Sequence, residues 1–175
     1  LELFSNYLSD LVTEIPGTYE NRPALIKTNI GNARLAGFDA EMEFNFYKSL
    51  VLYGNASFVN GENLDNNSAL PQIPPFNGRI GFKYNVANIA SLNFNSVIFS
   101  GQNRIAKGET LTSGYSLFNL YTDFNIINLN YFSLSLSAGI ENISDQYYIN
   151  HLSTNRGSAA LEPGRNYFLK TKFIF

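Results

Sequence analysis

Cysteine is absent from this sequence of 175 residues, and histidine occurs once, at position 151. Without thiols the chain cannot form disulfides or thiolate metal sites, and it cannot use a cysteine nucleophile. His151 also has no second histidine at the spacing that zinc-binding helices use. We therefore expect no metal site and no bound cofactor.

Charge is sparse as well. Charged residues make up 15% of the chain, against roughly 25% in an average soluble domain. The formal net charge is -2. Such a balance gives no electrostatic reason to expect nucleic acid as a partner.

Long apolar runs are missing too. A transmembrane helix needs about 18 or more consecutive apolar residues, and the sequence contains no such run. A membrane protein built from strands stays open. The sequence begins at Leu1 without a basic and then apolar leader, so we expect any signal peptide to lie upstream or to have been removed.

Apolar and polar residues instead alternate with a period of two, which is the pattern of a β-strand. In the clearest segment, Phe38, Met42 and Phe44 alternate with Asp39 and Glu41. The alternation is weakest over residues 1–14. The pattern predicts antiparallel strands, with no helix longer than about two turns, near residues 1–14, 25–46, 50–60, 73–84, 89–101, 114–127, 131–142 and 165–175.

Three features favour a transmembrane barrel over a soluble, lipocalin-like barrel. The polar positions are rich in Ser, Asn and Gly but poor in Lys, and aromatic residues gather near strand ends, as in membrane-interface girdles. The connections also alternate in length, which is typical of outer-membrane barrels. Short joins are expected near residues 47–49, 85–88 and 127–131, and long loops near 16–24, 61–72, 101–113 and 144–163. We predict an all-β, antiparallel, up-and-down transmembrane β-barrel segment of about eight strands.

This fold assigns the two faces of each strand to different surroundings. The side chains expected to face lipid are Phe38, Met42, Phe44, Leu134, Leu136, Leu169 and Phe173. Those expected to face the lumen are Asp39, Glu41, Glu43, Asn119, Asp123 and Ser135. The three clustered carboxylates could suggest acid–base chemistry, but their i, i+2 spacing on one strand face favours a polar lumen lining.

Several motifs resemble those of TonB-dependent receptors. The run at 139–148, GIENISDQYY, is similar to that family's G-x-x-N-L-x-D-x-x-Y stretch, and EPGRNYF at 162–168 resembles the start of its final strand. The segment 29–41, with Ile73-Pro74-Pro75-Phe76 and Thr112-Ser113-Gly114-Tyr115, matches in kind and order. Phe175 resembles the terminal aromatic residue of the assembly signal. Asp39 stands where Glu is usual, and Lys170 where Gly is common.

The resemblance implies more than the residues themselves. Such receptors are 22-stranded barrels that enclose a plug and reside in the bacterial outer membrane. Residues 1–175 would be the last eight strands, with the plug and the segment that engages TonB outside them. The expected partners are outer-membrane lipid, TonB through the plug, and a scarce extracellular ligand such as a ferric siderophore, haem, cobalamin or another metal complex. Eight strands can also close into a small barrel, so the sequence does not decide whether these strands close into a barrel of their own.

Candidate ligand contacts lie on the long loops, because binding groups concentrate on loops that a rigid scaffold positions. They are Gln102, Arg104, Asn150, His151 and Arg156, all expected at the extracellular mouth. The alternative is that the plug and upstream loops carry binding and these residues form only the rim.

Other functions were weighed against receptor-mediated uptake. The same architecture could be a small passive porin, an adhesin-like barrel or a structural barrel without active transport. An outer-membrane phospholipase or protease would need a clustered Ser, His and acidic set. His151 has no catalytic Ser motif near it in sequence, so no enzyme activity is expected.

Overall fold

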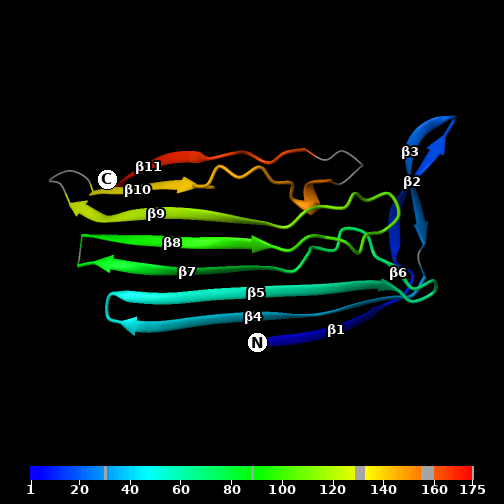
Figure 1. Cartoon of the computed structure of the whole chain (residues 1–175), viewed down its shortest axis with the longest axis horizontal. Coiled ribbons are helices and arrows are strands. Elements are labelled where there is room, and N and C mark those ends of the chain that lie inside the picture. Colours follow the sequence, from blue (N-terminus) through cyan, green and yellow to red (C-terminus); the bar gives the residue numbers. More distant parts are fainter. Residues whose placement is uncertain (30, 88, 129–132, 155–159, 175) are drawn as a thin grey trace.

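The computed structural model describes residues 1–29, 31–87, 89–128, 133–154 and 160–174. It is built from strands, apart from the four-residue 3₁₀ helix η1 (His151–Thr154). The strands are β1 (Glu2–Leu8), β2 (Val12–Tyr19), β3 (Arg22–Asn29), β4 (Ala33–Tyr47), β5 (Leu50–Asn63), β6 (Ser68–Ala69), β7 (Asn77–Val86), β8 (Ala90–Phe99), β9 (Tyr115–Asn128), β10 (Ser133–Glu141) and β11 (Asn166–Ile174) (Figure 1). In the described ranges, no helix is long and apolar enough to cross a membrane.

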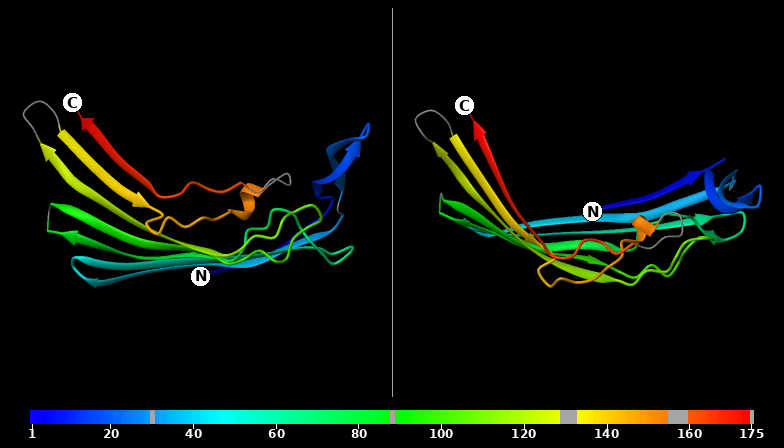
Figure 2. Two further views of the ribbon diagram at one scale, coloured as in Figure 1. Left: turned by 45° about the horizontal axis from the view of Figure 1, so that its top comes forward. Right: turned by 90° about the horizontal axis from the view of Figure 1, so that it is seen from above.

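The main sheet follows the chain order. Its strands run β1-β4-β5-β7-β8-β9-β10-β11, with β6 paired to the end of β5, and every pair is antiparallel. The eight-stranded antiparallel prediction is confirmed. The sheet is strongly curved but open, because its edge strands β1 and β11 are not paired with each other in the part that the structure describes (Figure 2).

One face of the sheet carries a continuous set of apolar side chains. Phe82, Phe94 and Phe118 contact one another across β7, β8 and β9, with ring centroids 5.7 and 6.2 Å apart. Phe38 and Phe58 form a similar pair between β4 and β5 at 6.2 Å. Such cross-strand aromatic pairs stabilise a sheet wherever the register brings the rings together.

The opposite face is polar and internally hydrogen-bonded. Tyr53 donates from its hydroxyl to Asn93 over 2.6 Å, Asn95 donates to Asn93, and Asn119 donates to Asn95 over 3.1 Å. Side chains of three strands, β5, β8 and β9, therefore alternate in the register that the sequence pattern predicts. The carboxylates of β4 lie on this face, because Glu43 pairs directly with Tyr53.

The sheet encloses no substantial core of its own. Its accessible surface is 11908 Å², whereas a compact folded protein of this mass exposes about 8,600 Å². Among the described residues, Ala33, Leu70 and Tyr115 are the only buried apolar residues. Met42 of β4 is 62% exposed and Leu169 of β11 is 69% exposed. An apolar face of this extent is stable beside lipid, where its exposure carries no hydrophobic cost.

The connection between β1 and β4 differs from the prediction. The first strand ends at Leu8 rather than near residue 14. The prediction of an irregular loop near residues 16–24 is wrong, because β2 and β3 form a separate two-stranded hairpin there. The prediction of one strand over residues 25–46 is wrong for the same reason: residues up to Asn29 belong to β3, and β4 begins at Ala33. Its two-residue turn, Glu20-Asn21, has positive φ at both positions (48° and 61°), which matches the twist of a tight hairpin. Pro16 lies within β2, and proline is tolerated there because this strand is at an edge.

The ends of the remaining strands agree with the expected alternation of connections. The β4–β5 and β7–β8 joins are tight, whereas long segments follow β5, β8 and β10. Strand β7 begins at Asn77, four residues later than predicted, because the preceding Pro74 and Pro75 have no N–H to donate. The aromatic residues Tyr131, Phe132 and Phe175 lie outside the described residues.

Candidate functional site

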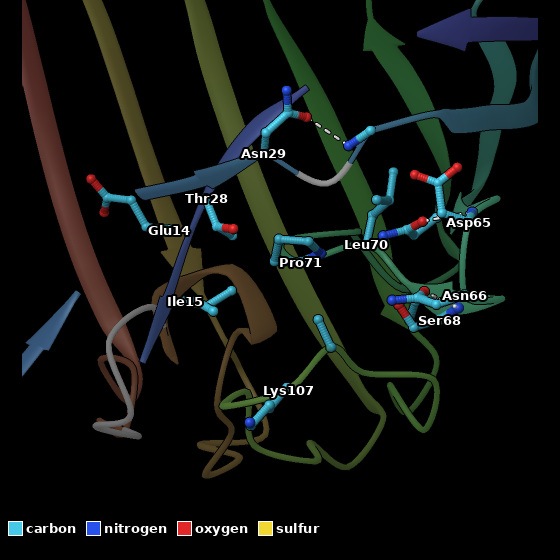
Figure 3. A pocket seen from close by; sticks show the side chains of 14 residues that line it. Glu14, Ile15, Thr28, Asn29, Asp65, Asn66, Ser68, Leu70, Pro71 and Lys107 are labelled. Atoms are coloured by element: carbon cyan, nitrogen blue, oxygen red, sulfur yellow. Dashed lines mark hydrogen bonds between the residues drawn. The ribbon is translucent and has the colours of Figure 1, made fainter. Parts of the chain in front are cut away.

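The hairpin and the long connections gather at one end of the sheet, opposite the tight turns (Figure 1). Among the described residues they comprise 9–29, 31–32, 64–76, 100–114, 142–154 and 160–165. A cavity of about 550 Å³ lies between the hairpin, the segment that follows β5 and the loop of residues 100–114 (Figure 3). Its lining includes Glu14, Ile15, Thr28, Asn29, Asp65, Asn66, Ser68, Leu70, Pro71 and Lys107.

Asp65 stabilises one side of this cavity through hydrogen bonds. Its carboxylate accepts hydrogen bonds from the backbone and the side-chain amide of Asn32, at 3.2 and 3.3 Å. On the hairpin side, the Asn29 side chain accepts a 2.6 Å hydrogen bond from the backbone of Gly31, which has a φ of +66° (Figure 3). Glycine adopts this conformation without strain, so the hairpin base can return tightly into β4.

Two charged groups of the cavity are uncommitted. Within the described residues, no hydrogen bond or ion pair engages the Glu14 carboxylate or the Lys107 ammonium. Figure 3 shows Glu14 on the hairpin side and Lys107 on the loop that closes the cavity from below. The cavity therefore offers the carboxylates of Glu14 and Asp65, one ammonium group, several amides and an apolar patch, which suits a polar small molecule with mixed charge.

Among the predicted ligand contacts, Gln102 stabilises the loop of residues 100–114 through its own hydrogen bonds. Its side chain is buried and donates to the Ile73 carbonyl at 2.8 Å, while its backbone forms an isolated bridge with Thr112. Its side-chain oxygen also accepts from the backbone of Arg104. Gln102 thus joins the loop of residues 100–114 to the segment that precedes β7.

Asn150 and His151 lie on the loop that follows β10, and His151 contacts the loop of residues 100–114. The Asn150 side chain accepts from the backbone of Leu152 at 3.0 Å, which begins the 3₁₀ turn η1. His151 is 4% exposed; its Nδ1 lies 3.3 Å from the Thr112 hydroxyl and its Nε2 lies 3.8 Å from the Glu109 carboxylate. His151 is therefore buried where two loops meet, rather than exposed to solvent.

Glu109 is the common partner of these loops. Its two oxygens accept backbone hydrogen bonds from Gln72 (2.6 Å) and Ala106 (2.8 Å), and the same carboxylate faces His151. Sequence reasoning did not single out Glu109, because its partners are distant in the chain. Buried polar groups of this kind stabilise a loop arrangement only when each finds a partner.

Arg104 points toward β5. It pairs with Glu62 at 3.3 Å and also contacts Asn60, while Glu62 pairs with Arg34 of β4 at 3.1 Å. Arg156, the fifth predicted contact, lies outside the described residues. The structure thus brings Gln102 and Arg104 together on one loop and joins His151 to it through Thr112 and Glu109.

Three stacked aromatic rings lie beside these loops, at the same end of the sheet. Tyr115 lies between Phe99 and Tyr148, with ring centroids 4.9 and 4.5 Å away. Burial, and then the nearby Glu162 and Glu141 carboxylates, raise the pKa of Tyr148 above its ordinary value. The Tyr148 phenol is therefore neutral at physiological pH and acts as a hydrogen-bonding and packing group.

The described part of the chain contains no group of three His, Cys, Asp or Glu side chains arranged to hold a metal ion. Of the two uncommitted cavity residues, Glu14 was not singled out from the sequence, because it belongs to the hairpin that was not recognised. Lys107 lies on the same basic loop as Gln102 and Arg104, which the sequence presents either as a contact for an anionic ligand or as an ordinary loop.

Known structures share this fold. The chain superimposes on the copper transporter OprC with a TM-score of 0.86 and 24% identity, covering 98% of this chain and 28% of that one. A mutant ferric enterobactin receptor from Pseudomonas aeruginosa gives 0.72 and 16% over the same shares. The ferric citrate transporter FecA gives 0.67 and 20%, covering 82% of this chain and 24% of that one.

The chain spans about a quarter of the length of these neighbours, 24–28%. Comparison with curated protein sequences found no match. Residues 1–143 match the sequence model described as TonB dependent receptor-like, beta-barrel, which covers most of the chain. Together with its open antiparallel sheet, apolar outer band and long loops at one end, this match shows that the chain belongs to the family of TonB-dependent receptor β-barrels.

Proposed function

We propose that residues 1–175 form the C-terminal wall of an outer-membrane transporter that takes up a scarce ligand with energy supplied through TonB. The family match over residues 1–143 is the observation that carries the proposal. The protein would not be an enzyme, since members of this family are transporters and receptors of the bacterial outer membrane. The plug, and the segment that engages TonB, would lie outside residues 1–175.

A metal complex is the proposed cargo. The structural neighbours include a copper transporter, a ferric enterobactin receptor and a ferric citrate transporter. A ferric siderophore or a similar chelate suits the loop end, because such a ligand presents carboxylate, amide or catechol groups around a cation. The uncommitted Lys107 ammonium and Glu14 carboxylate could each pair with such groups.

Uptake measurements test this function directly. The full-length receptor is expressed in cells that lack their own receptors, with and without TonB, and supplied with labelled ferric siderophores, haem, cobalamin and copper chelates. We expect accumulation of at least one complex that requires TonB. Accumulation of every small solute independently of TonB would instead indicate the passive porin.

Ligand contact is proposed for the cavity and for the loop residues Gln102, Asn150, His151 and Arg156. Arg104, which pairs with Glu62 of β5, would affect the ligand only through the position of the loop of residues 100–114. Because His151 links two loops through Thr112 and Glu109, its effect on affinity would be indirect, through the position of the loop that carries Asn150. The Glu14 and Lys107 side chains would act directly, because they are uncommitted in the cavity.

A binding titration on the purified full-length receptor separates these roles. We expect weaker affinity for the transported complex in the Glu14→Gln/Lys107→Gln double variant and in His151→Ala, with Lys83→Gln near the turn end as the unchanged control. Arg156→Ala is measured alone and combined with His151→Ala. Unchanged affinity in that combined variant would remove the loop of residues 142–165 from the site and leave it as rim.

A further inference from the structure

A charged cluster lies on the apolar face of the sheet rather than on its polar face. Arg34 and Glu62 face each other in the β4–β5 register and form a 3.1 Å ion pair. Arg34 alternates in phase with Phe38, and Glu62 with Phe58, whose rings contact each other on the apolar face. Arg104 joins this cluster from its loop, through Glu62 and Asn60.

Strand geometry puts the cluster at the height of lipid headgroups. On β4, the apolar positions from Phe46 to Phe38 extend over about 26 Å of strand at 3.3 Å per residue. At the usual tilt this is about 20 Å of height, close to the apolar band of about 25 Å in such barrels. Arg34 lies four residues beyond Phe38, about 10 Å higher by the same estimate. It therefore lies above the apolar band, toward the loop end.

Apolar surface continues beside the cluster. A cavity of about 280 Å³ is bounded by the upper part of β5, the segment before β7 and residues 100–104. Phe58, Phe76 and Arg104 contribute to its lining, and the Phe76 ring lies 6.5 Å from that of Phe38 on the apolar face. An occupant that joins an anionic group to an apolar chain would find both surroundings here.

The cluster carries a net positive charge, which favours the binding of an anion. Two guanidinium groups share the single Glu62 carboxylate, one on each oxygen. Each guanidinium has five N–H donors, and in the described residues Nε of Arg34 has no acceptor although it is buried. The Arg34 and Arg104 side chains are 38% and 46% exposed. The pair thus retains one net positive charge and accessible donors, which suit the planar oxygens of a phosphate.

We propose that Arg34 and Arg104 form a binding site for the phosphate of an anionic lipid, whose acyl chain packs on Phe38, Phe58 and Phe76. Glu62 pairs with both guanidinium groups and neutralises one of their two positive charges, so the remaining charge and donors are available to the phosphate. The inference rests on the membrane orientation proposed above. It makes lipid a specific partner of this part of the wall and ties the loop of residues 100–114 to the membrane surface.

Lipid retention tests the site without any transported ligand. Purified full-length receptor in detergent is incubated with phosphatidylglycerol or phosphatidylcholine, and bound lipid is counted by native mass spectrometry. We expect a preference for phosphatidylglycerol that falls about fivefold in Arg104→Gln and further in Arg34→Gln/Arg104→Gln, since each basic group near a membrane surface contributes about that factor. Inorganic phosphate at millimolar concentration should compete weakly, because it lacks the acyl chain.

The matched control is Arg79→Gln/Lys83→Gln, which removes two positive charges from β7 on the polar face. It should leave the lipid preference unchanged. Equal loss in this control would overturn the proposal, because it would reduce the effect to net charge. Full competition by inorganic phosphate would overturn the lipid assignment in favour of a simple anion site.

Glu62→Gln provides a test in the opposite direction. Removing the carboxylate frees both guanidinium groups, so phosphatidylglycerol binding should strengthen, whereas a purely structural ion pair would give loss or no change. This variant keeps the proposal falsifiable even if Arg34→Gln fails to assemble. Failure of TonB-dependent uptake would leave these lipid measurements unaffected, so the two proposals can fail independently.

Discussion

Asn142 is the residue whose chemistry most clearly determines the local backbone. It follows β10 with a φ of 50° and is 3% exposed. Its amide donates to the Gln146 carbonyl and accepts from the Gln146 backbone, both at 2.9 Å, and its own N–H donates to Asn119. Asparagine tolerates the left-handed region better than most residues. Asn142, which belongs to the motif at residues 139–148, therefore forms a turn that is hydrogen-bonded to Asn119 of β9.

Replacing Asn142 with alanine should destabilise the receptor. The change removes both side-chain hydrogen bonds and places alanine at a positive φ, which together cost about 2–4 kcal/mol. The measurement is the urea midpoint of the full-length receptor, followed by its heat-modifiable migration. Asn103→Ala is the control, because Asn103 is exposed. Matching midpoints for the two variants would contradict the role given to Asn142.

At the level of elements, the β2–β3 hairpin is an addition to the wall rather than part of it. It forms its own two-stranded sheet, and its hydrogen bonds to the rest of the chain gather near its base, at residues 10–11 and 29–32. Its strands contribute Glu14, Ile15 and Thr28 to the cavity. The hairpin can therefore change ligand contacts without changing strand pairing.

Deletion of the hairpin should separate binding from assembly. A receptor that lacks residues 12–30, with Leu11 joined to Gly31 through a short glycine linker, should still form the heat-modifiable barrel, because β1 and β4 pair without the hairpin. Its affinity for the transported complex should fall at least tenfold. Loss of the barrel itself would show that the hairpin is needed for folding, whereas unchanged affinity would remove the cavity from the site.

At the scale of the whole molecule, the sheet separates an apolar face from a hydrogen-bonded polar face. Leu136 lies in register with Phe124 and Thr171, whereas Ser135 points to the other side of β10. A charge facing lipid at mid-bilayer costs about 2–4 kcal/mol, while a charge facing the lumen is solvated. The two neighbouring positions should therefore respond oppositely to the same substitution.

We expect Leu136→Arg to reduce the assembled, heat-modifiable receptor strongly and Ser135→Arg to leave it close to wild type. Both variants add the same charge to the same strand one residue apart, so each is a control for the other. The amount of folded receptor in isolated outer membranes measures the difference. Similar losses in both variants would contradict the assignment of lipid and lumen faces.

The candidate site was predictable only in part. Long loops at one end followed from the spacing of turn residues, so Gln102 and His151 could be placed there. Their burial could not be predicted, because it depends on Thr112 and Glu109 meeting His151 across 39 and 42 residues. Glu14 escaped notice because Pro16 and Gly17 suggested a loop, and the Glu20-Asn21 turn lacks the usual Asn-Gly signal.

The sequence by itself determined the strand type, the eight long strands of the main sheet and the side of each strand that is apolar, but not the short β6 or the β2–β3 hairpin. These properties are local, because successive side chains of a strand point to opposite faces whatever its partner is. Only the tertiary structure decided that Arg34, Glu62 and Arg104 form one cluster. Their meeting depends on the β4–β5 register and on the path of a loop 42 residues away. Contacts of that range follow from the pairing of whole strands, and no short pattern in the chain encodes them.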